Sequence, residues 1–195
     1  MTTILTYQGD RYALVVSDTR VTGPYIDIGI QKVAEVGEYL LGCAGDVRAL
    51  NILHHAFKPP VCKPHFRGKA LDGFITATFI PALRGAFDMY GYSMPTSHDD
   101  AQHMAQQDSH IVVVINATIY LIYEDYCWTR SKGRVGGVGS GSGFAMGALE
   151  TILRNEPSAS LARVKPAMLH AIKTAARFDE YTSGPFRFSV QVHAA

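Results

Sequence analysis

The sequence predicts an α+β fold in which two antiparallel β-sheets stack face to face and helix pairs cover their outer surfaces. The expected elements come in the order strands, two helices, strands, two helices and a final strand. Strands grouped in blocks favour antiparallel sheets over a parallel sheet with alternating helices. The helices carry apolar stripes that must be buried against a sheet, and stacking the two sheets buries their remaining apolar faces.

Four short segments among the first 45 residues are rich in β-branched and aromatic residues, which favour strands. They are residues 2–8, 11–18, 31–36 and 38–45. Gly9-Asp10 and Gly37-Glu38 are typical of turns. From Asp46, which suits a helix N-cap, the apolar spacing becomes helical, and Pro59-Pro60 ends this helix.

The clearest helix covers residues 69–90, where apolar residues recur at three- and four-residue steps. Pro81 lies inside this pattern and should kink the helix. Residues 92–109 are polar and rich in His, Asp and Gln, so we expect an exposed loop or a short surface helix.

The second half repeats the change from strands to helices. Strands are expected at residues 110–117 and 118–125 around an Asn-Ala turn, then a short strand near residues 127–129. Residues 133–143 are predicted to form a glycine-rich connection. Helical spacing returns at residues 144–152 and 161–178, where Pro166 marks the first turn of the last helix or bends it. Strict alternation in residues 186–192 predicts a half-buried final strand. We expect a single domain over residues 1–195, since no repeat or linker divides the chain.

The composition excludes several classes of protein. Eighteen basic and seventeen acidic residues give a net charge of +1, without the basic excess that is usual in nucleic-acid binders. The longest apolar runs fall far below the roughly 20 residues of a membrane span. The opening residues lack the features of a signal peptide, and the three cysteines show no CxxC spacing. We therefore expect a cytoplasmic protein that binds neither nucleic acid nor membrane.

Two further signals do not lead to a cofactor or metal site. The segment GGVGSGSG lacks the Lys-Ser/Thr ending of a P-loop, and its glycines do not fit GxGxxG. The cluster of His98, Asp99, Asp100 and His103 lacks the histidine spacing of a zinc site, which favours a solvated loop. No cofactor and no metal are expected.

Thr2 is the first candidate for chemistry. Because residue 2 is small, the initiator methionine should be removable, leaving a threonine with a free α-amine beside its hydroxyl. A threonine hydroxyl needs a base within hydrogen-bond reach, and an α-amine with a pKa of about 7.7–8.0 can serve. Met-Thr openings are common, so an ordinary N-terminus is the alternative interpretation.

Three further residues strengthen the case. Asp18 ends the second strand segment, and Lys32 lies among apolar neighbours. Together they could form a buried pair whose ammonium lowers the pKa of the threonine hydroxyl. Gly45 ends a strand and precedes a helix, so its N–H could stabilise an oxyanion. Taken singly, each residue has an ordinary alternative: a solvated strand end, an outward-facing lysine and a turn glycine.

In this combination the sequence resembles the N-terminal nucleophile (Ntn) hydrolases of the proteasome β-subunit and HslV type. The similar segments run in the family's order and span almost the whole chain. They are Thr2-Thr3-Ile4, SDTRVTG, GCAGDVRAL, VGSGSGFAMGALE and DEYTSGPFRFSVQV. Lys32 departs from the pattern, since it lies about two residues nearer the N-terminus than the lysine of the family. The resemblance implies the four-layer αββα sandwich of the Ntn hydrolases.

The resemblance also implies roles. Thr2 would be nucleophile and base, Asp18 and Lys32 the orienting ion pair, and Gly45 the oxyanion donor. Ser140 would hydrogen-bond the amine of Thr2.

Ser183 and an acidic residue before it would complete that network. The family spacing of three residues selects Glu180, where aspartate is usual, whereas Asp179 has the usual residue type but lies one position too far. Thr22 would contact the substrate backbone. Cys43 and Val47 would line a small apolar pocket that disfavours charged side chains.

The implied function is a threonine peptidase that cleaves peptides or unfolded proteins by acyl transfer to Thr2. It would work inside a self-compartmentalised homo-oligomeric ring, with an ATP-dependent unfoldase as a possible partner. Methionine aminopeptidase would have to remove Met1. One alternative is an inactive structural or assembly subunit that retains Met1. Another is a small-molecule amidase of the same superfamily.

Overall fold

The computed structural model describes residues 2–22, 26–92, 108–130 and 134–193. Two antiparallel sheets form its centre. The first has the order β10-β1-β2-β11 and the second β5-β6-β7-β8-β9, with a separate β3-β4 ribbon. The strands are β1 (Thr3–Gln8), β2 (Tyr12–Ser17), β3 (Arg20–Thr22), β4 (Ile26–Ile28), β5 (Val33–Val36), β6 (Tyr39–Gly45), β7 (Ser109–Ile115), β8 (Thr118–Ile122), β9 (Trp128–Thr129), β10 (Val135–Gly139) and β11 (Arg187–Val192).

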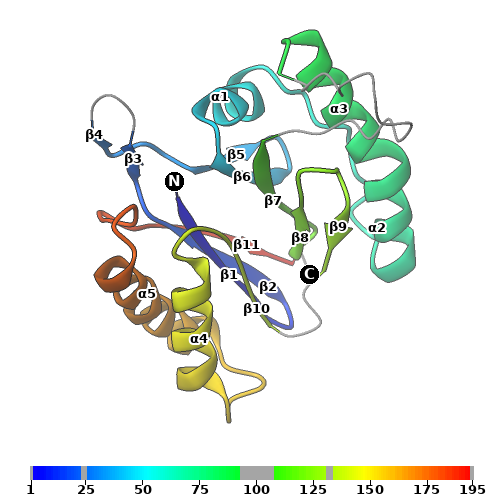
Figure 1. Cartoon of the computed structure of the whole chain (residues 1–195). Helices are drawn as coiled ribbons and strands as arrows, with labels where there is room; N and C mark the ends of the chain where they lie inside the picture. Colours follow the sequence, from blue (N-terminus) through cyan, green and yellow to red (C-terminus); the bar gives the residue numbers. More distant parts are fainter. Residues whose placement is uncertain (1, 23–25, 93–107, 131–133, 194–195) are drawn as a thin grey trace.

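Helices cover the outer face of each sheet (Figure 1). The second sheet is covered by α1 (Val47–His55), α2 (Gly68–Phe74), the π-helical η1 (Ile75–Phe79) and α3 (Ile80–Met89). The first sheet is covered by α4 (Ser142–Leu153) and α5 (Leu161–Phe178). The predicted four-layer αββα architecture is therefore confirmed.

Successive apolar side chains of one strand pack into different layers of the core. In β1, Ile4 packs between the two sheets, whereas Leu5 packs against α4 and α5. In β7, Val112 faces the other sheet and Val113 faces the helices α1 to α3. Because successive strand side chains point to opposite faces, strands that are apolar on both faces must lie between two covering layers.

Most predicted elements are present with bounds close to those expected. Asp46 caps α1 by accepting a hydrogen bond from the Arg48 N–H at 2.8 Å. The hairpin between β7 and β8 turns at Asn116 and Ala117, both of which have positive φ. Such a two-residue turn matches the twist of the paired strands. In α5, Pro166 lies inside the helix, so it does not mark the first turn.

The helix predicted over residues 69–90 is present as α2, η1 and α3 in succession. Pro81 has no N–H to donate, and the preceding turn is the π-helical segment η1. The polar stretch at residues 92–109 lies largely outside the described residues, including His98, Asp99, Asp100 and His103. Within the described part of the chain, no helix has the length and apolar character needed to cross a membrane.

The glycine-rich segment is a correction, because part of the predicted connection is a strand. Residues 135–139 form β10, which pairs with β1 so that Thr3 lies opposite Gly139. A side chain at Gly139 would overlap the carbonyl of Thr2, and its φ is +94°. Glycine has a low strand propensity, but here it allows two backbones to approach closely.

Candidate active site

Thr2 immediately precedes β1 and lies between two cavities. Its side chain is 5% exposed. A small cavity of about 40 Å³ is lined by Thr2, Lys32 and Gly45 together with apolar side chains. A larger cavity of about 710 Å³ is lined by Thr2, Gly45 and Ser140 among others. The residue predicted to be the nucleophile therefore lines cavities together with the residues expected to assist it.

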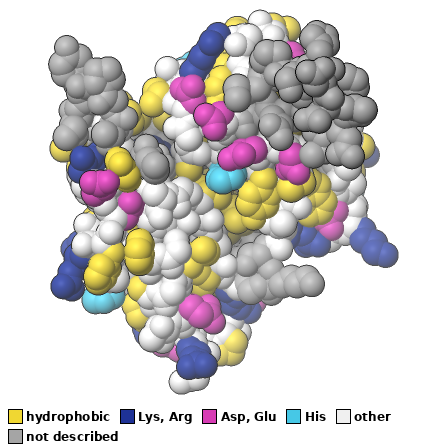
Figure 2. All heavy atoms as spheres, viewed as in Figure 1, with side chains coloured by type: hydrophobic (Ala, Val, Ile, Leu, Met, Phe, Trp, Pro, Cys, Tyr) yellow, Lys and Arg dark blue, Asp and Glu magenta, His cyan; other side chains and the backbone are white. Residues whose placement is uncertain are grey.

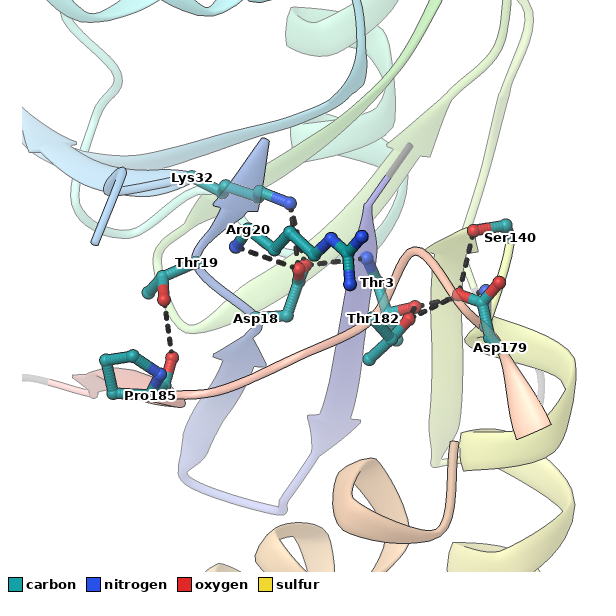
Figure 3. Close-up of polar contacts among 10 residues, drawn as sticks. Thr3, Asp18, Thr19, Arg20, Lys32, Ser140, Asp179, Thr182 and Pro185 are labelled. Carbon is teal, nitrogen blue, oxygen red and sulfur yellow. Dashed lines mark hydrogen bonds and ion pairs between the residues drawn. The ribbon is translucent and has the colours of Figure 1, made fainter. Parts of the chain in front are cut away.

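Asp18 and Lys32 form a buried ion pair. Lys32 Nζ donates to Asp18 Oδ1 at 2.8 Å and to Oδ2 at 3.0 Å. The two side chains are 2% and 0% exposed. The backbone N–H groups of Thr3 and Arg20 also donate to this carboxylate, at 2.8 and 3.1 Å. Figure 3 shows how the pair joins the strand ends around the start of β1.

Burial lowers the pKa of Lys32 below its ordinary value, because the charged ammonium is removed from water. The negative charge of Asp18 and its hydrogen bond oppose this shift. A buried ammonium that keeps its charge exerts a stronger field on its surroundings than an exposed one. Such a group can stabilise negative charge that develops on a nearby oxygen.

Gly45 lies where β6 ends and α1 is about to begin. Its φ of +149° suits glycine, and a Cβ there would collide with the Ser109 hydroxyl and the Asp108 carbonyl. The N–H of Cys43 donates to the Lys32 carbonyl at 3.2 Å. Because N–H directions alternate along a strand, the Gly45 N–H faces that same side, where no residue of β5 lies opposite it.

Ser140 belongs to a chain of hydrogen bonds at the other side of β1. Its hydroxyl donates to Asp179 Oδ2 at 2.9 Å. The Thr182 hydroxyl donates to the same carboxylate oxygen and lies 2.6 Å from the Thr3 hydroxyl. The Thr3 hydroxyl in turn accepts from the Gly141 N–H at 3.0 Å. Figure 3 shows Ser140 and Thr182 directed at the Asp179 carboxylate, beside Thr3.

This network contains Asp179 and Thr182 in place of the predicted Glu180 and Ser183. Glu180 is exposed, whereas Asp179 is 8% exposed and follows the last residue of α5. Ser183 is linked to this region through its carbonyl, which accepts from the Thr19 N–H at 3.4 Å. Measuring three residues back from Ser183 selects Glu180, whereas the carboxylate that accepts from the Ser140 hydroxyl is that of Asp179. Thr182 was missed, although a hydroxyl three residues after Asp179 was visible in the sequence.

Cys43 and Val47 line the small cavity together with Val21 and Leu50, and Asp46 also borders it. Burial raises the pKa of the Cys43 thiol to about 12, so this group stays neutral at physiological pH. Thr22 lies in β3, but its side chain is outside the described part of the structure.

The larger cavity is acidic. Its lining includes Asp46, Asp108 and Glu124, and no Lys or Arg is among its described lining residues. His110 also lines it, with Nε2 3.7 Å from Glu124 Oε1. Figure 2 shows acidic side chains and a histidine near the centre of this face, with most Lys and Arg nearer its edges. Clustered carboxylates in a cavity produce a negative local potential.

Among the residues that the structure describes, no group of three or more His, Cys, Asp or Glu side chains could hold a metal ion. The described groups of this site include hydroxyls, the Lys32–Asp18 ion pair, carboxylates, His110 and backbone N–H groups.

The fold is similar to that of proteasome-like proteins of known structure. The sequence matches no protein-family model and no curated protein. A structure of Thiobacillus denitrificans BPH in complex with epoxomicin matches all of this chain and all of its own, with a TM-score of 0.72 and 18% identity. Eukaryotic HslV from Trypanosoma brucei matches 98% of this chain and 100% of its own, with a TM-score of 0.64 and 15% identity.

A second structure of Thiobacillus denitrificans BPH matches 99% of each chain, with a TM-score of 0.70 and 15% identity. The likeness covers the whole domain in each case, so this chain has the proteasome/HslV-like Ntn hydrolase fold that its sequence resembled. At identities of 15–18% these comparisons show the fold alone.

Proposed function

We propose that this protein is an N-terminal threonine peptidase that hydrolyses peptide bonds by acyl transfer to Thr2. The observation that carries the proposal is the position of Thr2. It borders the buried Lys32 and the Gly45 turn in one cavity, and Gly45 and Ser140 in the other. In this proposal residues 1–195 act as one domain, which supplies every group needed for the reaction.

The proposed reaction begins once the α-amine of Thr2 is free. The amine takes the proton of the Thr2 hydroxyl, and the oxygen attacks the substrate carbonyl carbon. The Lys32 ammonium, held by Asp18, stabilises negative charge on the attacking oxygen. The Gly45 N–H donates to the oxyanion of the tetrahedral intermediate. The Thr2 ammonium then gives its proton to the leaving amine as the peptide bond breaks.

The second half of the reaction releases the acyl group. Water attacks the ester between Thr2 and the substrate, and the amine of Thr2 accepts one proton from that water. The carboxyl product leaves, and the Thr2 oxygen recovers a proton. Ser140, oriented by its hydrogen bond to Asp179, would hold the amine in place during both steps.

We further propose that the chain works as a homo-oligomeric ring in the cytoplasm, on peptides or unfolded proteins, with an ATP-dependent unfoldase as partner. The support for this part is the likeness of the fold to HslV and BPH. Enclosing the active sites inside a ring would restrict cleavage to chains that are threaded into it. Size-exclusion chromatography with light scattering tests the ring, and a monomer at micromolar concentration contradicts it.

The decisive experiment combines intact mass with labelling. Purified protein should have lost Met1, and incubation with epoxomicin should add the mass of one inhibitor per chain. Thr2→Ala should abolish both labelling and hydrolysis of fluorogenic peptides. Thr151→Ala, an exposed threonine of α4, is the matched control and should behave like the parent.

Retained Met1 with no labelling would contradict the proposal and favour the alternative of an inactive structural or assembly subunit. In that case the α-nitrogen of Thr2 is part of a peptide bond and cannot act as a base. Loss of Met1 with hydrolysis of small amides but no peptide turnover would instead indicate an amidase.

A further inference from the structure

The turn that carries the proposed oxyanion donor is anchored from behind by Ser109, the first residue of β7. The N–H of Asp46 donates to Ser109 Oγ at 3.1 Å. Ser109 Oγ also lies 2.8 Å from the hydroxyl oxygen of Tyr92, which follows α3. Ser109 and Tyr92 are 2% and 9% exposed. The Asp46 N–H is therefore held on the β7 side of the turn, through hydrogen bonds protected from water.

This anchor affects the direction of the neighbouring amide. N–H groups alternate in direction along β6, so fixing the Asp46 N–H toward β7 leaves the Gly45 N–H on the opposite side, with Thr2 and Lys32. The Ser109 hydroxyl also occupies the space that a Cβ of Gly45 would need. The backbone of the turn therefore lies directly against Ser109.

Two observations show how firmly Tyr92 is held. Its ring packs on Phe87 with centroids 4.9 Å apart, and its N–H donates to the Phe87 carbonyl at 2.8 Å. Burial raises the pKa of Tyr92 to about 12, so the phenol keeps its proton at physiological pH.

A second link between α3 and α1 runs in parallel, because Arg48 Nη2 donates to the Tyr90 carbonyl at 2.7 Å. The end of α3 thus supports the start of α1, as the arrangement in Figure 1 illustrates.

We infer that Ser109 and Tyr92 are positioning residues that hold the Gly45–Asp46 turn so that the Gly45 N–H is aimed at the oxyanion. This inference rests on the proposed function and deepens it. Ser109 lines the larger cavity with Thr2, but the hydrogen bonds of its hydroxyl run to the Asp46 N–H and to Tyr92. Tyr92 acts through Ser109, and Ser109 acts through the Asp46 N–H.

Steady-state kinetics of Ser109→Ala, Tyr92→Phe and the double variant test the inference. Loss of one oxyanion donor costs about 100- to 1,000-fold in kcat, so a displaced donor should cost about 10-fold or more. We expect Ser109→Ala to lower kcat by that amount with KM within about twofold of the parent, because the donor acts mainly on the transition state. Tyr92→Phe should lower kcat less, and the double variant should be no slower than Ser109→Ala.

Tyr39→Phe is the matched control. Tyr39→Phe also removes a buried hydroxyl, which donates to the Pro60 carbonyl at 2.6 Å. Tyr39 belongs to the same core cluster as Tyr92, but its hydroxyl is not bonded to Ser109. The Tm of this control variant should fall about as much as that of Tyr92→Phe, while its kcat stays that of the parent. A kcat loss shared equally by Tyr39→Phe and Tyr92→Phe would overturn the inference, since it would reflect general destabilisation.

Hydrogen-exchange mass spectrometry of residues 43–48 provides a readout that does not need activity. Ser109→Ala should speed exchange there, while exchange in the second half of α1 stays as in the parent. Faster exchange without any change in kcat or KM would overturn the catalytic part of the inference, and unchanged exchange would overturn the anchor itself. If the parent neither reacts with epoxomicin nor cleaves peptides, the proposed function fails, and exchange still decides whether Ser109 holds the turn.

Discussion

Lys32 Nζ lies 2.8 Å from Asp18 Oδ1, although the two residues are separated by the β3-β4 ribbon and both side chains are almost inaccessible to water. Removing a charge from water is costly, and each member of such a pair depends on the other. The start of β1 is tied to the same carboxylate through the Thr3 N–H. The pair therefore links the position of the chain end to the position of the ammonium.

The first prediction concerns the energetics of this pair. Asp18→Asn should lower the free energy of unfolding by about 3–5 kcal/mol, because it leaves the buried Lys32 ammonium without a counter-charge. The double variant Asp18→Asn/Lys32→Met should be less destabilised than the sum of the single variants. Urea denaturation provides the measurement.

The exposed pair of Arg163 and Glu156, with Nη2 2.6 Å from Oε1, is the matched control. Glu156→Gln should cost at most about 1 kcal/mol, since water screens exposed pairs. Equal losses for Asp18→Asn and Glu156→Gln would contradict the view that burial makes the Lys32–Asp18 pair interdependent.

The second prediction separates Asp179 from Glu180. Asp179→Asn should lower peptide turnover at least about tenfold, because Ser140 loses the charged acceptor that orients it. Glu180→Gln should change turnover by less than twofold, since that side chain is exposed. Initial rates at saturating substrate measure both effects. The reverse order of sensitivity would restore the assignment made from residue spacing.

The third prediction concerns acid stability. His54 in α1 lies with Nε2 3.0 Å from the Leu41 carbonyl, and burial lowers its pKa below the ordinary 6.5. The unfolded chain then binds a proton near pH 6.5 while the folded chain does not, so the unfolded state is favoured as the pH falls. The stability from this residue is complete above about pH 6.5 and decreases as the pH falls toward the lowered pKa.

Urea midpoints between pH 5 and pH 7.5 check this expectation. His54→Gln should flatten the part of the pH dependence that this histidine contributes. His170→Gln is the control, because His170 is an exposed histidine on a different helix, α5, and its replacement should leave the contribution of His54 in place. A parent and a His54→Gln variant with identical profiles would show that His54 does not contribute.

The fourth prediction concerns the glycines near Thr2. Gly139→Ala should destabilise the protein by about 2–4 kcal/mol, since its Cβ would overlap the Thr2 carbonyl and the backbone has a positive φ. Gly143→Ala is the matched control on the next helix, where a Cβ would meet no atom within 4 Å. Alanine is a better helix former than glycine, so Gly143→Ala should raise the free energy of unfolding by up to about 1 kcal/mol. Similar Tm values for the two variants would contradict the close approach of β10 to Thr2.

Local patterns in the sequence were enough to predict the layers. The apolar run in residues 110–117, the alternation in residues 186–192 and the helical spacing in residues 161–178 depend on neighbours a few positions apart. Each segment is present as a strand or helix. Asp46 could be predicted as an N-cap for the same reason, since a cap hydrogen bond is made within the first turn. Thr2, Asp18, Lys32 and Gly45 were selected from the chemistry of their side chains or backbone and their order along the chain.

The identity of the acid near Ser140 depended on how α5 ends and how the chain returns to β11. A single residue separates Asp179 from Glu180, and local spacing cannot tell which of them faces β1. β10 was missed because strand formation there is stabilised by pairing with β1, 128 to 136 residues earlier, and not by its own glycines. The amino-acid pattern therefore specified elements whose stabilising contacts are local. The polar network and the anchor behind Gly45 required the folded chain, because their partners come from strands and loops far apart in sequence.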